Sequence, residues 1–310
     1  MRGHLYGAVM KEHDESGELL GMAYAAGAYA IWGLVPLYWR LMSDLSPVEI
    51  TLHRVFWAGV FAVLATAARG RFRHLMHIFA RRQTLAALAL SSVLIAANWT
   101  IFIYCVSTNQ LVEASLGYYL TPLVSIALGV LVLGERVSPL RWVAIALASC
   151  AIGARALELG HIPWIAPGLA LSFGFYGYIR KRTSVDALDG LTVETILLFP
   201  VVAAVLGIWA VKGTGAFAAP FPIRDLLLIS TGPVTAIPLA LFAAGARRIR
   251  MTTLGFLQYV SPTITLAIAT LLLGEKFGAF DAVAFGCVWI ALVLVGFESG
   301  MARSAARRAV

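Results

Sequence analysis

The sequence predicts an all-α polytopic membrane protein of ten transmembrane helices, arranged as two inverted five-helix repeats. Three observations predict this fold class. First, 60% of the residues are hydrophobic and only 13% are charged, whereas soluble domains carry about 25% charged residues. Second, charge-free runs long enough to cross a bilayer, about 20 residues, recur along the chain. Third, the basic residues lie between these runs, and one run is repeated 140 residues later.

The repeated run covers residues 116–135 and carries no charge before its last residue. Residues at seven of its positions recur at a constant offset of 140: Tyr119, Pro122, Ala127, Leu131, Leu133, Gly134 and Glu135 match Tyr259, Pro262, Ala267, Leu271, Leu273, Gly274 and Glu275. Apolar composition explains matched leucines and alanines, but not tyrosine, proline and Gly-Glu at one spacing. We interpret the match as an internal duplication.

The apolar runs give the predicted helices, which are 19–39, 47–68, 83–105, 112–133, 140–156, 163–179, 191–211, 226–246, 251–273 and 280–297. They divide the chain into a cytoplasmic tail, two repeats and a basic cytoplasmic tail, at 1–18, 19–157, 158–298 and 299–310. We expect Gly134 and Gly274 to close the fourth helix of each repeat, with the following glutamates at the water interface.

The distribution of basic residues predicts the orientation. Of the 24 lysines and arginines, five fall in the odd-numbered loops, namely Arg40, Arg155, Lys212, Arg224 and Lys276. Arg54 lies within a helix, and the other 18 fall in the tails and even-numbered loops. Because positive residues stay in the cytoplasm, both termini should be cytoplasmic.

The duplication has a geometric consequence for function. Each repeat holds an odd number of helices, so the second repeat enters the membrane from the opposite side. Secondary transporters have this inverted topology, and they bind substrate near the midplane between the repeats. We therefore predict a carrier that moves a small organic solute by alternating access, without cofactor or ATP.

Other functional classes fit the residues less well. The net charge of +8 is spread over short loops, which argues against nucleic acid as a partner. The cysteines, Cys105, Cys150 and Cys287, all lie in apolar runs, which indicates neither disulfides nor a metal site. The alternatives are a membrane-embedded enzyme acting on a lipid or intramembrane substrate, and a passive channel or sensor. Catalytic acids or metal-ligand clusters at a recognisable spacing would favour the enzyme, and the sequence has none.

Ionisable residues inside apolar runs are candidate functional residues, because a charge in a membrane is costly. Arg54 is the first candidate, as an anchor for a zwitterionic or acidic substrate. Glu113 and Glu194 are candidates to carry a coupling proton. The alternative for each is that its side chain extends to the nearest interface. We expect His53, beside Arg54, to be a packed interfacial residue.

Aromatic and polar residues around two helix-breaking prolines complete the predicted site. Pro122 and Pro262 fall near the middle of equivalent helices, where each would kink its helix and free the carbonyl four residues before it. In lipid such a carbonyl needs a polar partner. We expect nearby residues that can form hydrogen bonds to line one shared substrate site: Tyr119, Thr121, Gln258, Tyr259 and Ser261. Tyr118 is a further predicted substrate contact. Trp32 and Trp99 lie deep enough to stack on a substrate ring, although dense packing would also explain all of these side chains.

Several stretches resemble one transporter family. They are Y-A-I-W-G-L-V-P (29–36), H-R-V-F-W (53–57), N-W-T-I-F-I (98–103), E-A-S-L-G-Y-Y-L-T-P-L-V (113–124), L-G-E-R (133–136), F-Y-G-Y-I-R-K (175–181), T-L-G-F-L-Q-Y-V-S-P-T (253–263) and G-E-K (274–276). Two repeats with a proline in the fourth helix and a closing Gly-Glu resemble EamA-domain proteins of the drug/metabolite transporter superfamily. The set is closest to the RarD, or chloramphenicol-sensitive protein, branch. The resemblance implies a bacterial inner-membrane permease that exports small metabolites or drugs, and it transfers no catalytic residue.

Overall fold

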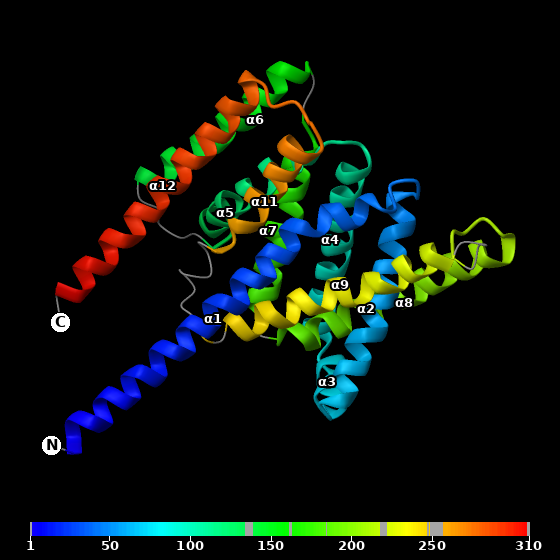
Figure 1. Cartoon of the computed structure of the whole chain (residues 1–310), viewed down its shortest axis with the longest axis horizontal. Helices are drawn as coiled ribbons and strands as arrows, with labels where there is room; N and C mark the ends of the chain where they lie inside the picture. Colours follow the sequence, from blue (N-terminus) through cyan, green and yellow to red (C-terminus); the bar gives the residue numbers. More distant parts are fainter. Residues whose placement is uncertain are drawn as a thin grey trace. The chain divides into compact units, whose positions relative to one another are not determined.

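The computed structural model describes residues 2–133, 139–160, 163–183, 185–217, 222–246, 248 and 257–308. Every regular element among these residues is a helix, as the sequence predicts (Figure 1). In chain order they are α1 Arg2–Arg40, α2 Pro47–Ala68, α3 Phe72–Ala80, α4 Arg82–Ser107, α5 Leu111–Leu133, α6 Pro139–Leu159, α7 Ile165–Thr183, α8 Ala187–Lys212, α9 Pro222–Ala246, α11 Val260–Ala267, the π-helix η1 Ile268–Leu272 and α12 Ala279–Arg308.

Several of these helices are built to cross a bilayer. Within the described part of the chain, five are long and apolar enough: Gly17–Arg40, Pro47–Ala68, Arg82–Ser107, Leu188–Lys212 and Pro222–Phe242. Two shorter apolar stretches, Val260–Leu272 and Ala279–Leu294, follow. A chain with several such helices is a multi-pass membrane protein.

The structure differs from the predicted helices in four places. The predicted tail after residue 298 continues helix α12, which ends at Arg308. The nine-residue helix α3 lies where the sequence predicted only a loop. The predicted tail before residue 19 continues helix α1, which begins at Arg2. The predicted helix 251–273 is not continuous, because residues 258–259 form a turn before α11 and its last turn is the π-helix η1.

The chain folds into two compact units that are each discontinuous in sequence. Unit 1 holds Met1–Ser92 and Ser184–Thr265, and unit 2 holds Val93–Thr183 and Leu266–Val310. Each unit therefore combines helices from the first and the second half of the chain. Unit 1 contains α1, α2 and α3 together with α8 and α9, and unit 2 contains α5, α6, α7 and α12.

In unit 1, α2 packs against both α8 and α9, and α9 also packs against α1. Each of α2 and α8 places an acidic residue in its first turn, where the helix dipole favours negative charge. Glu49 of α2 accepts a hydrogen bond of 2.6 Å from the backbone N–H of Ala216, which follows the end of α8. Asp189 of α8 forms an ion pair with Arg71, which follows the end of α2. The start of each helix thus lies at the end of the other, so α2 and α8 run antiparallel.

In unit 2, α6 packs beside α12, and α5 packs against α7 (Figure 1). The α5–α7 contact is close enough to need glycine. A Cβ atom on Gly117 would lie 2.9 Å from the carbonyl oxygen of Ala166, a distance that a real side chain does not tolerate. Backbones that approach this closely gain the dispersion contacts that hold helices together in a membrane.

The start of α5 is capped by a residue far away in sequence. Gly274 ends the π-helix with a left-handed φ of 65°, which confirms its predicted closing role. The next residue, Glu275, accepts hydrogen bonds from the backbone N–H groups of Leu111 at 3.0 Å and Val112 at 2.9 Å. These are donors that the first turn of a helix leaves without an intrahelical partner. Glu275 therefore does more than mark the interface, because it ties the end of η1 to the start of α5. The corresponding Gly134 and Glu135 lie outside the described residues.

We expect Glu275→Ala to loosen the first turn of α5. Loss of a helix cap costs about 1–2 kcal/mol, so the amides of Leu111 and Val112 should exchange hydrogen about tenfold faster. Mass spectrometry of peptides that cover residues 108–120 would measure this exchange. Glu275→Gln keeps one oxygen acceptor and should give an intermediate rate. Lys276→Ala, at an exposed neighbour, is the control, and equal exchange in all variants would contradict the capping role.

Candidate functional site

A buried arginine forms the centre of the candidate site in unit 1. Arg54 is the eighth residue of α2 and is only 7% exposed. Its Nε donates a hydrogen bond of 3.1 Å to Oγ1 of Thr235 on α9. The guanidinium carbon lies 5.1 Å from the centre of the Trp39 ring on α1, which is a cation–π distance. Three helices of unit 1 therefore hold this charge.

Trp39 and two rings on the helix of Arg54 carry buried polar atoms that have no hydrogen-bond partner among the described residues. They are Nε1 of Trp39, Nδ1 of His53 and Nε1 of Trp57. The rings of His53 and Trp57 pack on Phe217, with centroids 5.4 Å and 6.0 Å away. Because buried polar atoms are nearly always paired, three unpaired ring nitrogens on Trp39 and on α2 mark this part of unit 1 as unusual.

A second charged residue occupies the matching place on α8. Glu194 is the eighth residue of α8, 140 positions after Arg54, and is 2% exposed. Its Oε1 accepts a hydrogen bond of 2.6 Å from the hydroxyl of Ser91 on α4. Arg54 and Glu194 therefore lie on neighbouring helices, and each bonds to a hydroxyl on a different third helix.

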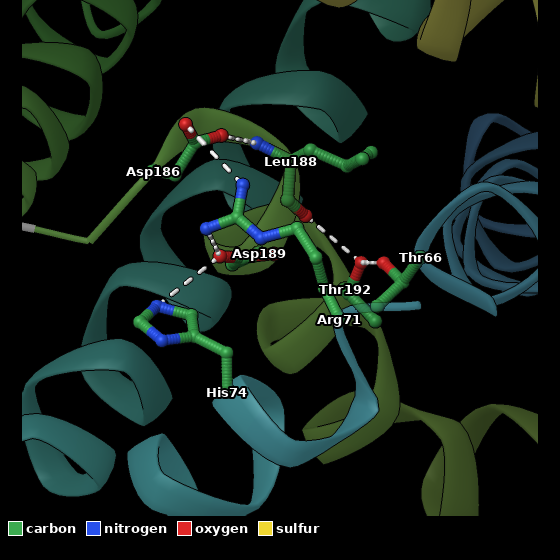
Figure 2. A network of polar contacts seen from close by, with 7 residues as sticks. All are labelled: Thr66, Arg71, His74, Asp186, Leu188, Asp189 and Thr192. Atoms are coloured by element: carbon green, nitrogen blue, oxygen red, sulfur yellow. Dashed lines mark hydrogen bonds and ion pairs between the residues drawn. The ribbon is translucent and has the colours of Figure 1, made fainter. Parts of the chain in front are cut away.

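A polar network joins the end of α2 to the start of α8 (Figure 2). Asp189 is fully buried, and its Oδ2 lies 2.7 Å from a guanidinium nitrogen of Arg71 and 3.4 Å from Nε2 of His74. Asp186 caps α8 by accepting a hydrogen bond of 3.1 Å from the N–H of Leu188. The sequence alone did not predict Asp189, because nothing near it in the chain indicates a partner more than 100 residues away.

Unit 2 contains a buried polar group that the sequence alone also did not predict. The amide nitrogen of Asn98 on α4 donates hydrogen bonds to Oγ of Ser172 at 2.9 Å and to the carbonyl of Leu169 at 3.0 Å, both on α7. Its amide oxygen accepts from the hydroxyl of Tyr118, at 3.1 Å. The predicted site residue Tyr118 is thus positioned by Asn98. The only sequence feature that could have predicted this group is the amide side chain of Asn98 inside an apolar run.

The remaining predicted residues divide between the two units. In unit 1, Trp32 packs on Tyr29 and Phe242. Pro262 is buried in the first turn of α11, and Gln258 and Tyr259 form the turn before that helix. In unit 2, Tyr119 is 4% exposed and packs on Phe285 and Trp289. Trp99 is half-buried. Glu113 lies in the first turn of α5 and is 6% exposed. Pro122 lies within the bounds of α5, but its side chain is outside the described residues. One shared site for Tyr119 and Gln258 stays a prediction.

Comparison with known proteins identifies the family. Residues 19–154 match the model of the EamA-like transporter family. An uncharacterized transporter of Pseudomonas aeruginosa is 42% identical, over 91% of this chain and 94% of its own length. Protein RarD of Escherichia coli is 40% identical, over 88% and 93%. This chain belongs to the EamA-like transporter family. The predicted membership, including the RarD branch, is therefore confirmed.

One further sequence relative and one solved structure are also similar to this chain. The chloramphenicol-sensitive protein RarD of Pseudomonas aeruginosa is 30% identical, over 94% of this chain and 98% of its own length. A crystal structure with a TM-score of 0.52 and 18% identity covers 91% of this chain and 98% of that one, which indicates a shared fold. As an EamA-like transporter with bacterial relatives and membrane-spanning helices, the protein is a multi-pass inner-membrane transporter.

We expect Asp189→Asn to lower the stability of unit 1 by about 1–2 kcal/mol. Breaking a buried ion pair can cost more, but Arg71 is one-third exposed and regains water. Thermal unfolding in detergent would measure the change. Asp44→Asn is the matched control, because Asp44 also pairs with an arginine, Arg224 at 2.6 Å, but is 55% exposed. Its loss should change the unfolding temperature little, and equal effects of the two substitutions would contradict a stabilising role for the buried ion pair.

Proposed function

We propose that this EamA-like protein is a ten-span secondary transporter built from two inverted repeats, 19–157 and 158–298. It moves a small organic solute across the inner membrane by alternating access, with both termini in the cytoplasm. The family resemblance favours outward transport. The observation that carries the proposal is that equivalent residues of the two halves make matching contacts, each with a segment of the opposite half.

The exchange is clearest at the starts of α2 and α8. Glu49 and Asp189 are 140 residues apart, and each is the third residue of its helix. Glu49 binds the segment after α8, whereas Asp189 binds the segment after α2. Two helices related by a two-fold axis in the membrane plane would exchange partners in this way. The contacts therefore support the inverted arrangement, with the two acids at opposite faces of the membrane.

Glycine contacts give a second, independent match. In unit 1, a Cβ on Gly33 of α1 would lie 2.7 Å from Cβ of Ile264 in α11. In unit 2, a Cβ on Gly174 of α7 would lie 2.7 Å from Cγ1 of Val124 in α5. Val124 and Ile264 are 140 residues apart. The spacing between Gly33 and Gly174 is one residue longer than 140. In both units the first helix of one predicted repeat thus meets the fourth helix of the other.

We propose that Arg54 anchors an acidic group of the substrate. The guanidinium is a fixed positive charge within α2, and charged hydrogen bonds to a carboxylate or phosphate are its strongest contacts. Trp39, which contacts the guanidinium, and His53 and Trp57, on the same helix as Arg54, carry ring nitrogens without a partner among the described residues. A small organic acid would supply acceptors for donors among these ring nitrogens, and its apolar part would contact the tryptophan and Phe217 rings.

The other predicted residues keep their proposed roles. Glu194 and Glu113 are candidates for proton coupling, because both are buried carboxylates in membrane helices. Tyr118, Tyr119, Gln258 and Tyr259, with Trp32 and Trp99, are proposed substrate contacts. Pro122 and Pro262 are the proposed hinges of the two fourth helices.

The topology is testable with reporters. Since 18 basic residues fall on one predicted side and five on the other, a reporter fused after Val310 should be active only in the cytoplasm. A reporter inserted between Thr108 and Leu111 should be active only in the periplasm. Finding both reporters on the same side would end the ten-span proposal.

We expect Arg54→Gln to reduce transport of acidic solutes at least tenfold, because a hydrogen bond to a charged group contributes about 1.5–3 kcal/mol. The assay is counterflow in proteoliposomes with radiolabelled amino acids, aromatic acids and chloramphenicol as probes. Counterflow requires a carrier and fails for a channel or an enzyme. Arg54→Lys keeps the charge and should retain part of the transport.

Arg182→Gln is the control for charge, because Arg182 is exposed and bonds to Tyr178 on its own helix. Membrane abundance and unfolding temperature of each variant would be measured in parallel. Normal counterflow by Arg54→Gln would remove Arg54 from the site and leave the carrier proposal standing. Absence of counterflow for every probe in the parent protein would argue against the carrier itself.

A further inference from the structure

Helix α3 has more apolar surface than the protein covers. Leu75 and Ile78 are buried and pack with Leu88 of α4 and Val193 of α8. Phe72 and Met76 are 47% and 57% exposed. At about 100° per residue, Phe72 and Met76 lie on the helix side that adjoins Leu75. They extend the apolar face of α3 away from the protein.

The opposite side of α3 is polar, and it completes an amphipathic pattern. Continuing around the helix from Met76, the next large side chains are those of Arg73 and His77, both exposed, and then His74, whose Nε2 lies 3.4 Å from Asp189. Around the axis the order is therefore a protein-packed apolar face, an exposed apolar face and a basic face. A helix with an apolar face and a basic face is suited to lie in the plane of a membrane surface.

The chain holds α3 at the end of two membrane spans. Only residues 69–81 separate α2 from α4, and both of these helices are candidate spans. Nine residues of helix are about 13 Å long, which is too short to cross a bilayer. Packing of Leu75 and Ile78 against unit 1 also prevents α3 from moving away into the aqueous phase. With α2 and α4 across the membrane, the exposed Phe72 and Met76 would lie at the boundary between the lipid headgroups and the acyl chains.

The charge of this segment selects one kind of lipid. Between residues 69 and 82 there are five arginines and no aspartate or glutamate. Arg71 is held by Asp189, but Arg69, Arg73, Arg81 and Arg82 are exposed. Arginine binds phosphate bidentately, and basic residues beside a membrane attract anionic lipids.

We propose that α3 is an interfacial helix that binds an anionic phospholipid. Phe72 and Met76 contact the acyl chains, and the exposed arginines at both ends of α3 contact the headgroup phosphate. This inference depends on α2 and α4 spanning the membrane, and it does not depend on the proposed substrate or mechanism. It adds a lipid to the partners of the protein and assigns a function to a helix that the sequence alone did not predict.

Native mass spectrometry of the full-length protein with added lipid tests the proposal. We expect phosphatidylglycerol to bind at least tenfold more tightly than phosphatidylcholine, since each basic residue near a membrane surface contributes about fivefold. Arg73→Gln/Arg81→Gln/Arg82→Gln leaves only Arg69 and should reduce this preference to about fivefold or less. Phe72→Ser/Met76→Ser should weaken binding of both lipids, because it removes acyl-chain contacts without a change in charge.

The matched control removes three exposed basic residues elsewhere, Arg182, Arg248 and Lys276, by substitution with glutamine. It should keep the preference for phosphatidylglycerol. Equal binding of the two lipids by the parent would overturn the proposal, as would loss of the preference in the control. Competition by soluble glycerol phosphate at equal concentration would also overturn it, because it would indicate a phosphate site and no contact with acyl chains. Unfolding temperatures equal to that of the parent establish that the variants are folded.

Discussion

The absence of water from the bilayer core constrains every polar group in this protein. A buried hydrogen-bonding group that cannot reach water must find a partner inside the protein. Hydroxyls such as those of Thr100 and Ser115 bond to the carbonyl four residues earlier in their own helix. Asn98, Glu194 and Arg54 instead bond to side chains on other helices. These pairings fix which helices must be neighbours, and apolar packing then fills the space around them.

Hydropathy was sufficient to find most helices, because a span must be long and apolar whatever it packs against. Helix α2 has the predicted ends, Pro47 and Ala68. Helix α3 was missed because its nine residues mix arginine and histidine with apolar residues. A hydropathy window as long as a membrane span averages such a segment to the value of a loop. The turn at residues 258–259 and the π-helix Ile268–Leu272 were missed because apolar periodicity records no backbone hydrogen bonds.

The candidate site was predictable to the extent that it is chemically conspicuous. Arg54 and Glu194 were found because a charge inside an apolar run is rare. Their partners Thr235 and Ser91 were not, since serine and threonine are common in membrane helices and each contact joins residues more than 100 positions apart. Glu275 was noticed for its repeat with Glu135, yet its two hydrogen bonds to the start of α5 follow only from tertiary structure.

The discontinuity of unit 1 has a consequence for biosynthesis. Its first part ends at Ser92 and its second begins at Ser184, so α1 and α2 are translated long before α8 and α9. Arg54 precedes Thr235 by 181 residues, which at the usual rate of synthesis is about 10–40 s. During that time the arginine is present in a nascent helix without its hydroxyl partner. Water at the insertion machinery, or a delayed exit of α2 into the lipid, must stabilise this charge until the second half of the chain arrives.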